Sequence, residues 1–349
     1  MSGYLSDVYE KYCTEIWCDS PNPVDLDRML GLGARGATSN PVLIGRAIEA
    51  DPDRWAAELP AVRSQGGPAN WGLYRRVARR ASECLLPLYE RTGGRQGLLS
   101  VQIDPRLWNS VLPMIAMARE ARAIAPNISV KVPATKAGLI VAEELAAEGI
   151  NCTVTVSYTV PQVIAIGEAF RRGKARAIKD GKLPTDAPLH SWAVLMVGRL
   201  DDHLRDVVRE GAIDVAPELL TKAGNAVAKK AYGIYKERGY ESKLLIAAMR
   251  GNYHIDQFIG GDLVVTVPPA NELELAKAYD GKAPPRRIDE PVPQEAIDEL
   301  YERFEDFQKA YDIDGMTAEE FEQFGPCVKT LNQFKGGWES VIRFVEERQ

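Results

Sequence analysis

Residues 128–156 read ISVKVPATKAGLIVAEELAAEGINCTVTV. The segment opens with Ile128–Val132, a short apolar run rich in β-branched residues that is typical of a buried strand. Gly138–Ala147 has the composition of a helix, and Asn151–Val156 again has the character of a strand. A strand, a helix and a second strand in this order predict a βαβ unit, in which the two strands lie parallel.

Strands and helices alternate in the same way along most of the chain. The other expected strands are Ile16–Asp19, Gly36–Ser39, Leu98–Ile103, Trp192–Val197, Lys243–Ala247 and Leu263–Val267. The other expected helices are Val24–Leu32, Asn70–Arg91 with Asn70 as its N-cap, Trp108–Ile124, Pro161–Arg172, Asp201–Arg209 and Pro217–Arg238. Eight such units over roughly 250 residues predict an α/β fold, a closed (β/α)8 TIM barrel. An open, doubly wound parallel sheet is the alternative.

The pattern changes after the last expected strand. A proline-rich connector at residues 283–293 divides the chain into a barrel domain, residues 1–282, and a C-terminal helical extension, residues 283–349. Apolar side chains at residues 297–311 recur at helical spacing, which predicts a helix packed on the barrel. A last helix is expected over Trp338–Phe344.

The composition argues against several classes of protein. The 349 residues include 43 Lys and Arg against 49 Asp and Glu, a net charge of −6, whereas general nucleic-acid binders are basic. The five cysteines and three histidines show no metal-ligand spacing, and no apolar run has the length of a membrane span. We therefore expect a soluble cytoplasmic protein with no metal, no nucleic-acid partner and no membrane partner. The oligomeric state is left open, with a homodimer as one option.

A glycine-rich motif at residues 31–36 has the spacing G-x-G-x-x-G of dinucleotide-binding proteins. Here a helix precedes the motif and a strand follows it, which is the reverse of the order that a pyrophosphate site requires. We expect a helix C-cap and a turn at this place, and no cofactor.

Lys131 is the residue of the quoted segment that does not fit a purely structural role. Val130 and Val132 share one face of the expected strand, so Lys131 points to the other face, into the barrel near its carboxyl-end rim. Burial lowers the pKa of a lysine, and a neutral amine forms a Schiff base with a carbonyl substrate. A lysine paired with an interior carboxylate for structural reasons is the alternative, and the strand alone does not decide between the two.

Polar side chains stand at the carboxyl ends of the other expected strands, where the chemistry of TIM barrels is built. Each of them alone is more often a helix cap or a loop anchor, and only their convergence around a lysine favours a catalytic site. They are Asp19, Thr38, Asn40, Gln102, Thr153, Thr155, Arg199 and Arg250.

Five segments occur together in an order that is hard to obtain by chance. They are Thr38-Ser39-Asn40-Pro41, Ser100-x-Gln102-x-Asp104-Pro105-Arg106, Lys131-Val-Pro-Ala-Thr135-x-x-Gly138, Gly149-Ile-Asn151-x-Thr153-x-Thr155 and Val197-Gly198-Arg199-x-Asp201. On these segments the sequence resembles the transaldolase family, from about residue 13 to residue 270. The resemblance implies a (β/α)8 barrel with metal-independent class I aldol chemistry on phosphorylated sugars, as in the pentose phosphate pathway.

The resemblance also implies a role for each site residue. Lys131 would form the Schiff base, and Asp19 would act as acid and base on the C4 hydroxyl of the sugar. Asn40 would hold the dihydroxyacetone unit, while Arg199 and Arg250 would bind the sugar phosphate. Gln102 and Thr155 complete the expected catalytic set, and Thr38 and Thr153 the expected substrate-binding set.

The sequence departs from the family pattern at several of these positions. Gln102 stands where transaldolases of this type usually have a glutamate, and a glutamine there resembles the fructose-6-phosphate aldolase branch, which releases free dihydroxyacetone. That branch has a tyrosine where this chain has Met196, and transaldolases commonly have a phenylalanine there. Thr153 stands where asparagine is usual, and Val194 and Ala248 stand where serines are common, which suggests altered substrate recognition.

Three functions follow from these observations. The first is transaldolase-like transfer of a dihydroxyacetone unit between sugar phosphates. The second is a class I aldolase that releases free dihydroxyacetone, which Gln102 favours. The third is a catalytically inactive barrel that binds sugar phosphates, and the presence together of Asp19, Lys131, Thr155 and the two arginines speaks against it.

Overall fold

The computed structural model describes residues 4–185, 188–278 and 282–348. In this part of the chain eight parallel strands close into a barrel, because each strand pairs with the next and β8 pairs with β1. The strands are β1 Glu15–Cys18, β2 Gly36–Thr38, β3 Leu98–Gln102, β4 Ile128–Pro133, β5 Cys152–Thr155, β6 Ser191–Met196, β7 Lys243–Ala247 and β8 Val264–Val267. The predicted TIM barrel is therefore confirmed, and the open sheet is excluded.

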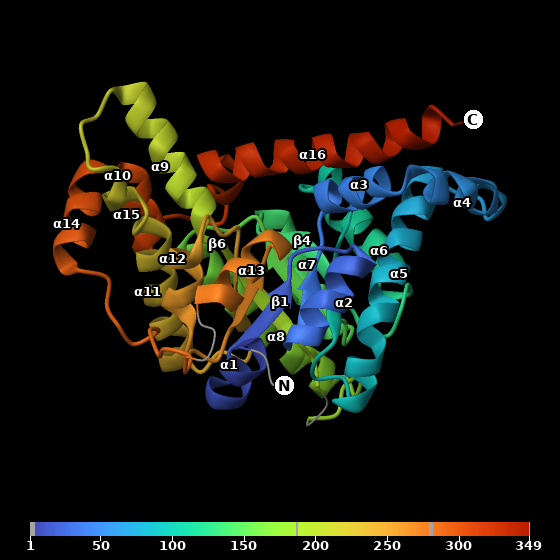
Figure 1. The fold of residues 1–349 in the computed structure, drawn as a ribbon, viewed down its shortest axis with the longest axis horizontal. Coiled ribbons are helices and arrows are strands. Elements are labelled where there is room, and N and C mark those ends of the chain that lie inside the picture. The colour runs from blue at the N-terminus through green and yellow to red at the C-terminus, as the bar shows by residue number, and fades with distance from the viewer. Residues whose placement is uncertain (1–3, 186–187, 279–281, 349) are drawn as a thin grey trace.

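Helices surround the barrel on the outside (Figure 1). Those that connect successive strands are α2 Pro23–Leu32, α5 Ala69–Arg91, α6 Val111–Arg122, α7 Lys136–Ala147, α8 Val160–Lys179, α9 Val197–Gly211 and α11 Ala223–Arg238. Further helices are α1 Tyr4–Tyr12, α3 Pro41–Ala50, α4 Pro52–Ser64, α10 Pro217–Leu220, α12 Asn252–Ile255, α13 Pro269–Ala278, α14 Gln294–Arg303, α15 Glu305–Tyr311 and α16 Gly325–Glu346. None of the described helices is both long enough and apolar enough to cross a membrane.

Several of the expected helix starts are wrong. The helix expected from Asp201 begins four residues earlier, at Val197, and the one expected from Gly138 begins two residues earlier, at Lys136. The helix expected from Asn70 begins one residue earlier, and Pro68 holds the N-cap position, so Asn70 lies in the first turn and is not the cap. The helix expected from Trp108 begins three residues later, because Pro105–Leu107 form a separate 3-10 turn. That turn is stabilised by the side chain of Asp104, which accepts a hydrogen bond from the backbone N–H of Arg106.

Four further expected helices differ in length or continuity. The helix expected over Pro161–Arg172 is the longer α8, Val160–Lys179. The segment 217–238 forms two helices, α10 and α11, and the apolar segment 297–311 forms α14 and α15, because the backbone of Phe304 is extended (φ −129°, ψ 105°). The side chain of Phe304 is nonetheless buried in the main core, as expected for a segment that packs on the barrel. The helix expected over Trp338–Phe344 is the 22-residue α16.

A tight turn after β4 fixes the strand that carries Lys131. Thr135 is the N-cap of α7, and its hydroxyl accepts a hydrogen bond from the N–H of Gly138 at 3.0 Å and donates one to the carbonyl of Trp108 at 2.7 Å. A Cβ atom on Gly138 would lie 1.8 Å from the carbonyl oxygen of Pro133. Only glycine fits here, so the chain turns directly from the strand end into the helix.

Helix α16 crosses the top of the barrel and packs along α3 (Figure 1). Gly337 lets the two helices approach closely, since a Cβ there would lie 2.6 Å from the backbone nitrogen of Val42. Trp338 packs against the ring of Tyr74 with centroids 5.1 Å apart, and Thr330 bonds the hydroxyl of Tyr158 at 2.6 Å. The C-terminal segment is therefore part of the barrel mouth, and a division into two domains at residue 282 stays a prediction.

Candidate active site

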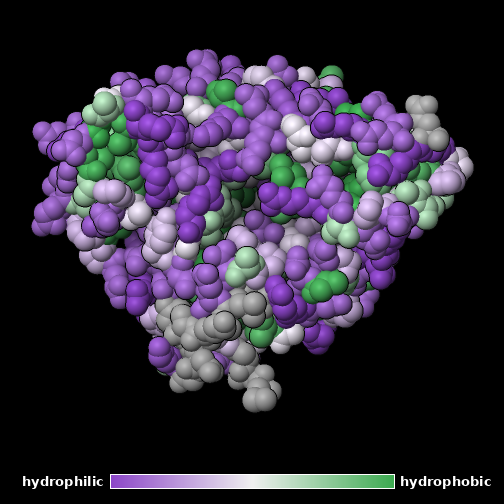
Figure 2. Space-filling view, turned by 45° about the horizontal axis from the view of Figure 1, so that its top comes forward, coloured by the Kyte–Doolittle hydropathy of each residue, from purple (hydrophilic) through white to green (hydrophobic). Residues whose placement is uncertain are grey.

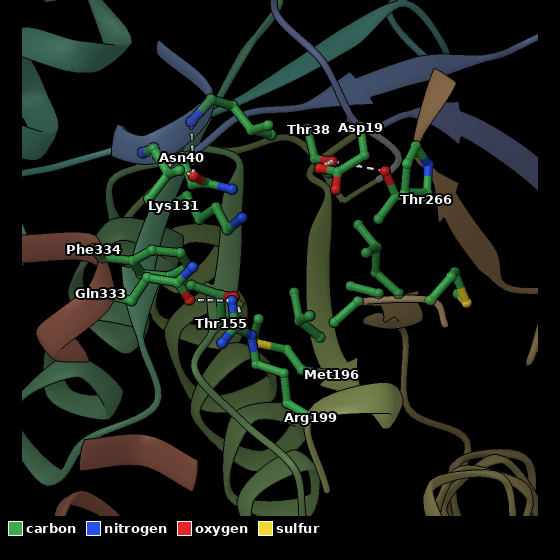
Figure 3. A pocket seen from close by; sticks show the side chains of 18 of the residues that line it. Asp19, Thr38, Asn40, Lys131, Thr155, Met196, Arg199, Thr266, Gln333 and Phe334 are labelled. Atoms are coloured by element: carbon green, nitrogen blue, oxygen red, sulfur yellow. Dashed lines mark hydrogen bonds between the residues drawn. The ribbon is translucent and has the colours of Figure 1, made fainter. Parts of the chain in front are cut away.

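A cavity of about 300 Å³ opens at the carboxyl ends of the strands. Figure 2 shows the corresponding hollow near the middle of the face that α16 crosses, and Figure 3 shows the side chains that line it. Most of the lining comes from strand ends. A second group, which we call the roof, comes from α3 and α16 and consists of Val42, Leu43, Arg46, Gln333 and Phe334.

Lys131 is one of the residues that line this cavity (Figure 3). Its side chain points inward from β4, is only 6% exposed, and donates a hydrogen bond from Nζ to the carbonyl of Ser39 at 3.1 Å. Burial lowers its pKa to about 8; the negative charge of Asp19 opposes this change and the positive charge of Arg199 adds to it. At pH 7 about one amine in ten is therefore unprotonated.

Asp19 follows β1 and is bonded by Thr38 of β2, which is bonded in turn by Thr266 of β8. Thr38 donates its hydroxyl proton to Asp19 Oδ1 at 2.7 Å, and Thr38 Oγ1 lies 2.6 Å from the hydroxyl of Thr266. Because Thr38 uses its only proton on Asp19, Thr266 is the donor in the second bond. Burial raises the pKa of Asp19, while the bond from Thr38 and the charge of Lys131 oppose that rise.

Asn40 and Thr155 also line the cavity. Asn40 is the N-cap of α3, and its Oδ1 accepts hydrogen bonds from the N–H groups of Val42 and Leu43 at 3.0 and 3.1 Å. Its side chain lies beside that of Lys131 (Figure 3). The hydroxyl of Thr155, at the end of β5, lies 3.9 Å from the sulfur of Met196.

Arg199 and Arg250 line the side of the cavity formed after β6 and β7. Arg199 donates from Nη2 to Gln333 of the roof, and its buried Nε has no hydrogen-bond partner among the described residues. Arg250 donates from Nε and Nη2 to Asp202 at 2.9 and 2.6 Å, and from Nη1 to the carbonyl of Ala248 at 2.9 Å. The two guanidinium groups therefore differ in their hydrogen-bond partners among the described residues. Arg250 is paired with a carboxylate, whereas Arg199 is bonded to a neutral amide.

The backbone of the Arg250 loop is anchored by a buried histidine. The N–H of Arg250 donates to His254 Nδ1 at 3.0 Å, and His254 Nε2 lies 2.9 Å from Asp201 Oδ2. Since Nδ1 accepts a hydrogen bond from the backbone N–H, the ring proton sits on Nε2, which donates to Asp201. Both side chains are completely buried, so the loop that presents Arg250 is rigidly placed.

Two of the predicted site residues do not line the cavity. Thr153 lies deeper in the barrel, where its hydroxyl contacts those of Ser100 and Ser129 at 2.8 Å each. Gln102 is in register with Lys131 on the adjacent strand, is 2% exposed, and has no partner for Oε1 among the described residues. The structure brings the other predicted residues, Asp19, Thr38, Asn40, Lys131, Thr155, Arg199 and Arg250, to one cavity, and their individual roles stay predictions.

Several residues of the cavity were not predicted. Thr266 stands near the end of an expected strand, so the position carried a usable signal. Arg46, Gln333 and Phe334 carried none, because they reach the cavity only through the docking of α3 and α16.

The fold and the cavity together define a (β/α)8 barrel whose mouth combines an interior lysine with a carboxyl group and arginines. Comparison with known families is more specific. Residues 16–339 match the family described as Transaldolase/Fructose-6-phosphate aldolase, and the chain belongs to this family. The predicted family resemblance is thereby confirmed.

Several individual relatives of the chain are named transaldolase. The chain is 28% identical over 314 residues to the Transaldolase of Thiobacillus denitrificans. This alignment covers 82% of this chain and 84% of that protein. It is 31% identical over 208 residues to Transaldolase 1 of Streptomyces avermitilis and 32% identical over 211 residues to the Transaldolase of Thermobifida fusca. These two alignments cover 58% of this chain, which spans about half the length of each relative, 54% and 55%.

Proposed function

We propose that this protein transfers a dihydroxyacetone unit between phosphorylated sugars through a Schiff base on Lys131. The observation that carries the proposal is Lys131 itself, a buried lysine with a pKa of about 8 in a cavity that also holds Asp19. What distinguishes Lys131 is its position, because its amine donates to the backbone carbonyl of Ser39 inside the cavity at the carboxyl ends of the strands.

The first step joins the donor sugar to the enzyme. The unprotonated amine of Lys131 adds to the C2 carbonyl of a ketose phosphate. The adduct then takes up one proton from solvent and loses water, which leaves a protonated imine; the proton is given back when the imine is hydrolysed. Asp19 then takes the proton of the C4 hydroxyl, the C3–C4 bond breaks, and an aldose phosphate leaves. The bonding electrons move to C3 and give an enamine, for which the imine nitrogen is the electron acceptor.

The second half reverses these events on another aldehyde. The enamine carbon attacks the carbonyl carbon of the acceptor, and Asp19 returns its proton to the new hydroxyl oxygen. Water then hydrolyses the imine and restores the free amine of Lys131. Asp19 suits this double role because burial raises its pKa while the hydroxyl of Thr38 stabilises its charged form.

Membership of the family and the names of the relatives support transaldolase-type chemistry. Gln102 favours the second candidate, an aldolase that releases free dihydroxyacetone. An amide can orient a water molecule but cannot accept its proton, and the unpartnered Oε1 of Gln102 lies beside the strand of Lys131. Protonation of the enamine by solvent then competes with attack on the acceptor.

Trapping with borohydride tests the proposal directly. Incubation with fructose 6-phosphate and borohydride is expected to leave a reduced adduct on Lys131, and the yield is expected to rise between pH 6 and pH 8 as the amine loses its proton. Lys131→Arg should give no adduct and no turnover, because a guanidinium stays protonated.

Lys229 provides a matched control. Burial lowers its pKa to about 8 as well, but it lies on α11 outside the cavity, and its Nζ donates to the carbonyl of Arg287 at 2.7 Å. Lys229→Arg should therefore keep both activity and labelling. An adduct on Lys229, or no adduct on Lys131 with any ketose phosphate, would reject the proposal and leave the inactive barrel as the better interpretation.

A further inference from the structure

Three arginines line the cavity, and their charges are balanced very differently. Arg250 is paired with the carboxylate of Asp202 through two hydrogen bonds, and Arg199 is bonded to the neutral amide of Gln333. Arg46, on α3, forms no hydrogen bond or ion pair with any residue that the structure describes. A guanidinium that faces a substrate cavity without a counter-charge is a ready contact for an anionic group.

The side from which Arg46 approaches follows from the barrel topology. Helix α3 begins directly after β2, whereas Arg199 follows β6. In a closed barrel of eight strands in sequential order, β2 lies diametrically opposite β6, and β4 with Lys131 lies midway between them. Arg46 and Arg199 therefore flank the lysine from opposite sides of the cavity mouth.

The face of α3 that carries Arg46 is the one that closes the cavity. Val42, Leu43 and Arg46 are spaced along one side of the helix, and all three line the cavity with Asn40 at the helix start. The positive charge of Arg46 also acts on Asp19: burial raises the pKa of that carboxyl group, and Arg46 is one of the groups that oppose the rise. Arg46 is thus within electrostatic reach of the reacting atoms.

We infer, on the basis of the proposed function, that Arg46 binds a second anionic group of the donor, at the end opposite the phosphate held by Arg199 and Arg250. The donor class would then extend to ketoses phosphorylated at both ends, from which the transferred unit would be dihydroxyacetone phosphate. The chemistry needs no additional step, because the C3–C4 bond still breaks and the C1 phosphate stays on the transferred unit. The remaining neutral contact near that end is the amide of Asn40.

The experiment compares fructose 6-phosphate with fructose 1,6-bisphosphate in the borohydride assay and in turnover. In the wild type both sugars should give an adduct on Lys131. Arg46→Gln should raise KM for the bisphosphate about tenfold more than for the monophosphate, the effect of losing one charge-assisted contact. Arg46→Lys should recover part of the difference, because the charge remains.

Arg54→Gln is the control, since Arg54 lies outside the cavity, on α4, with its guanidinium over the ring of Trp55 at 5.2 Å. It should leave both KM values unchanged. An equal effect of Arg46→Gln on the two sugars, no effect on either, or an adduct formed only by the monophosphate would overturn this inference. Absence of an adduct with both sugars in the wild type would instead overturn the proposed function.

Discussion

Lys131 and Asp19 owe their altered pKa values to one physical cause with opposite effects. Burial disfavours a charge of either sign, so it lowers the pKa of the lysine to about 8 and raises that of the aspartic acid. At pH 7 a lysine with this pKa is unprotonated in roughly one molecule in ten. Burial thus favours the neutral form of both groups, which leaves part of the Lys131 amine unprotonated and makes the Asp19 carboxylate easier to protonate.

The first prediction at the scale of a single residue concerns the side chain of Gln102. In Gln102→Glu, a carboxylate next to the strand of Lys131 can accept a proton from water, which should shift the products from free dihydroxyacetone toward the transferred sugar. The same negative charge should raise the pKa of Lys131 and slow adduct formation at pH 7. The measurement is the ratio of released to transferred three-carbon unit at a fixed acceptor concentration.

Gln102→Met separates loss of the amide from gain of the carboxylate, because it keeps the length of the side chain and has no proton acceptor of comparable strength. The ratio should change with glutamate and not with methionine. An unchanged ratio in Gln102→Glu, with the fold intact, would show that partitioning is set elsewhere, at Met196 or in the roof.

The second prediction concerns Thr266, whose hydroxyl bonds that of Thr38 and thereby orients Thr38 toward Asp19. In Thr266→Val the hydroxyl of Thr38 loses its donor and can turn away, so the carboxylate of Asp19 is less stabilised and its pKa rises further. We expect kcat to fall about tenfold and the acidic limb of the pH profile to move to higher pH. Thr266→Ser should restore both, and a Val variant with an unmoved acidic limb would contradict the positioning role.

Sequence reasoning placed Lys131, Asp19, Arg199 and Arg250 at the cavity, because each stands at or just after a strand end and the alternation of a strand gives the face of a side chain. It misplaced Thr153 because alternation does not give the depth of a side chain in the barrel. The strands of a barrel are tilted and staggered. The hydroxyl of Thr153 therefore contacts those of Ser100 and Ser129 below the cavity and does not line it.

At the scale of elements, the strands were predictable and the roof was not. Every expected strand occurs in the structure with bounds that differ by at most two residues, because short β-branched runs are local signals. The helices α3 and α4 after β2 were not expected, and α16 was expected at a third of its length. Residues 41–64 pack against residues 325–346. Contacts between segments so far apart in the chain cannot be predicted from a local sequence pattern.

Two adjacent glycines on α16 provide a matched test of this packing. A Cβ on Gly337 would lie 2.6 Å from the backbone nitrogen of Val42, whereas a Cβ on Gly336 would meet nothing within 4 Å. Gly337→Ala should force α16 away from α3, lower the free energy of unfolding by roughly 1–3 kcal/mol, and raise KM because the roof opens. Gly336→Ala should be neutral or stabilising by up to about 1 kcal/mol, since alanine favours a helix.

Urea unfolding and steady-state kinetics of both variants check this prediction. If the two substitutions have the same effect on KM, the contact between α3 and α16 does not shape the cavity. If Gly337→Ala lowers stability without changing KM, the roof contributes to folding and not to substrate binding.

At the scale of the whole molecule, the buried lysine reduces the stability of the fold, and the reduction depends on pH. The pKa of Lys131 is about 8 in the folded protein and 10.5 for an ordinary lysine. Below pH 8 the folded and unfolded chains both carry the proton, and the folded state bears the full penalty, about 3 kcal/mol for a shift of this size. Between pH 8 and 10.5 the unfolded chain binds more protons, so stability rises with pH until the penalty disappears.

Lys131→Met removes the charge and keeps an apolar side chain of similar length. We therefore expect this variant to unfold with a free energy about 2–3 kcal/mol higher than the wild type at pH 7, and to lose most of that advantage at pH 10. Urea unfolding of both proteins at the two pH values measures the difference, in which the titration of all other groups largely cancels. A variant that is no more stable at pH 7, or whose advantage persists unchanged at pH 10, would show that the barrel accommodates the charged lysine without cost, and the basis for a nucleophilic amine near neutral pH would be lost.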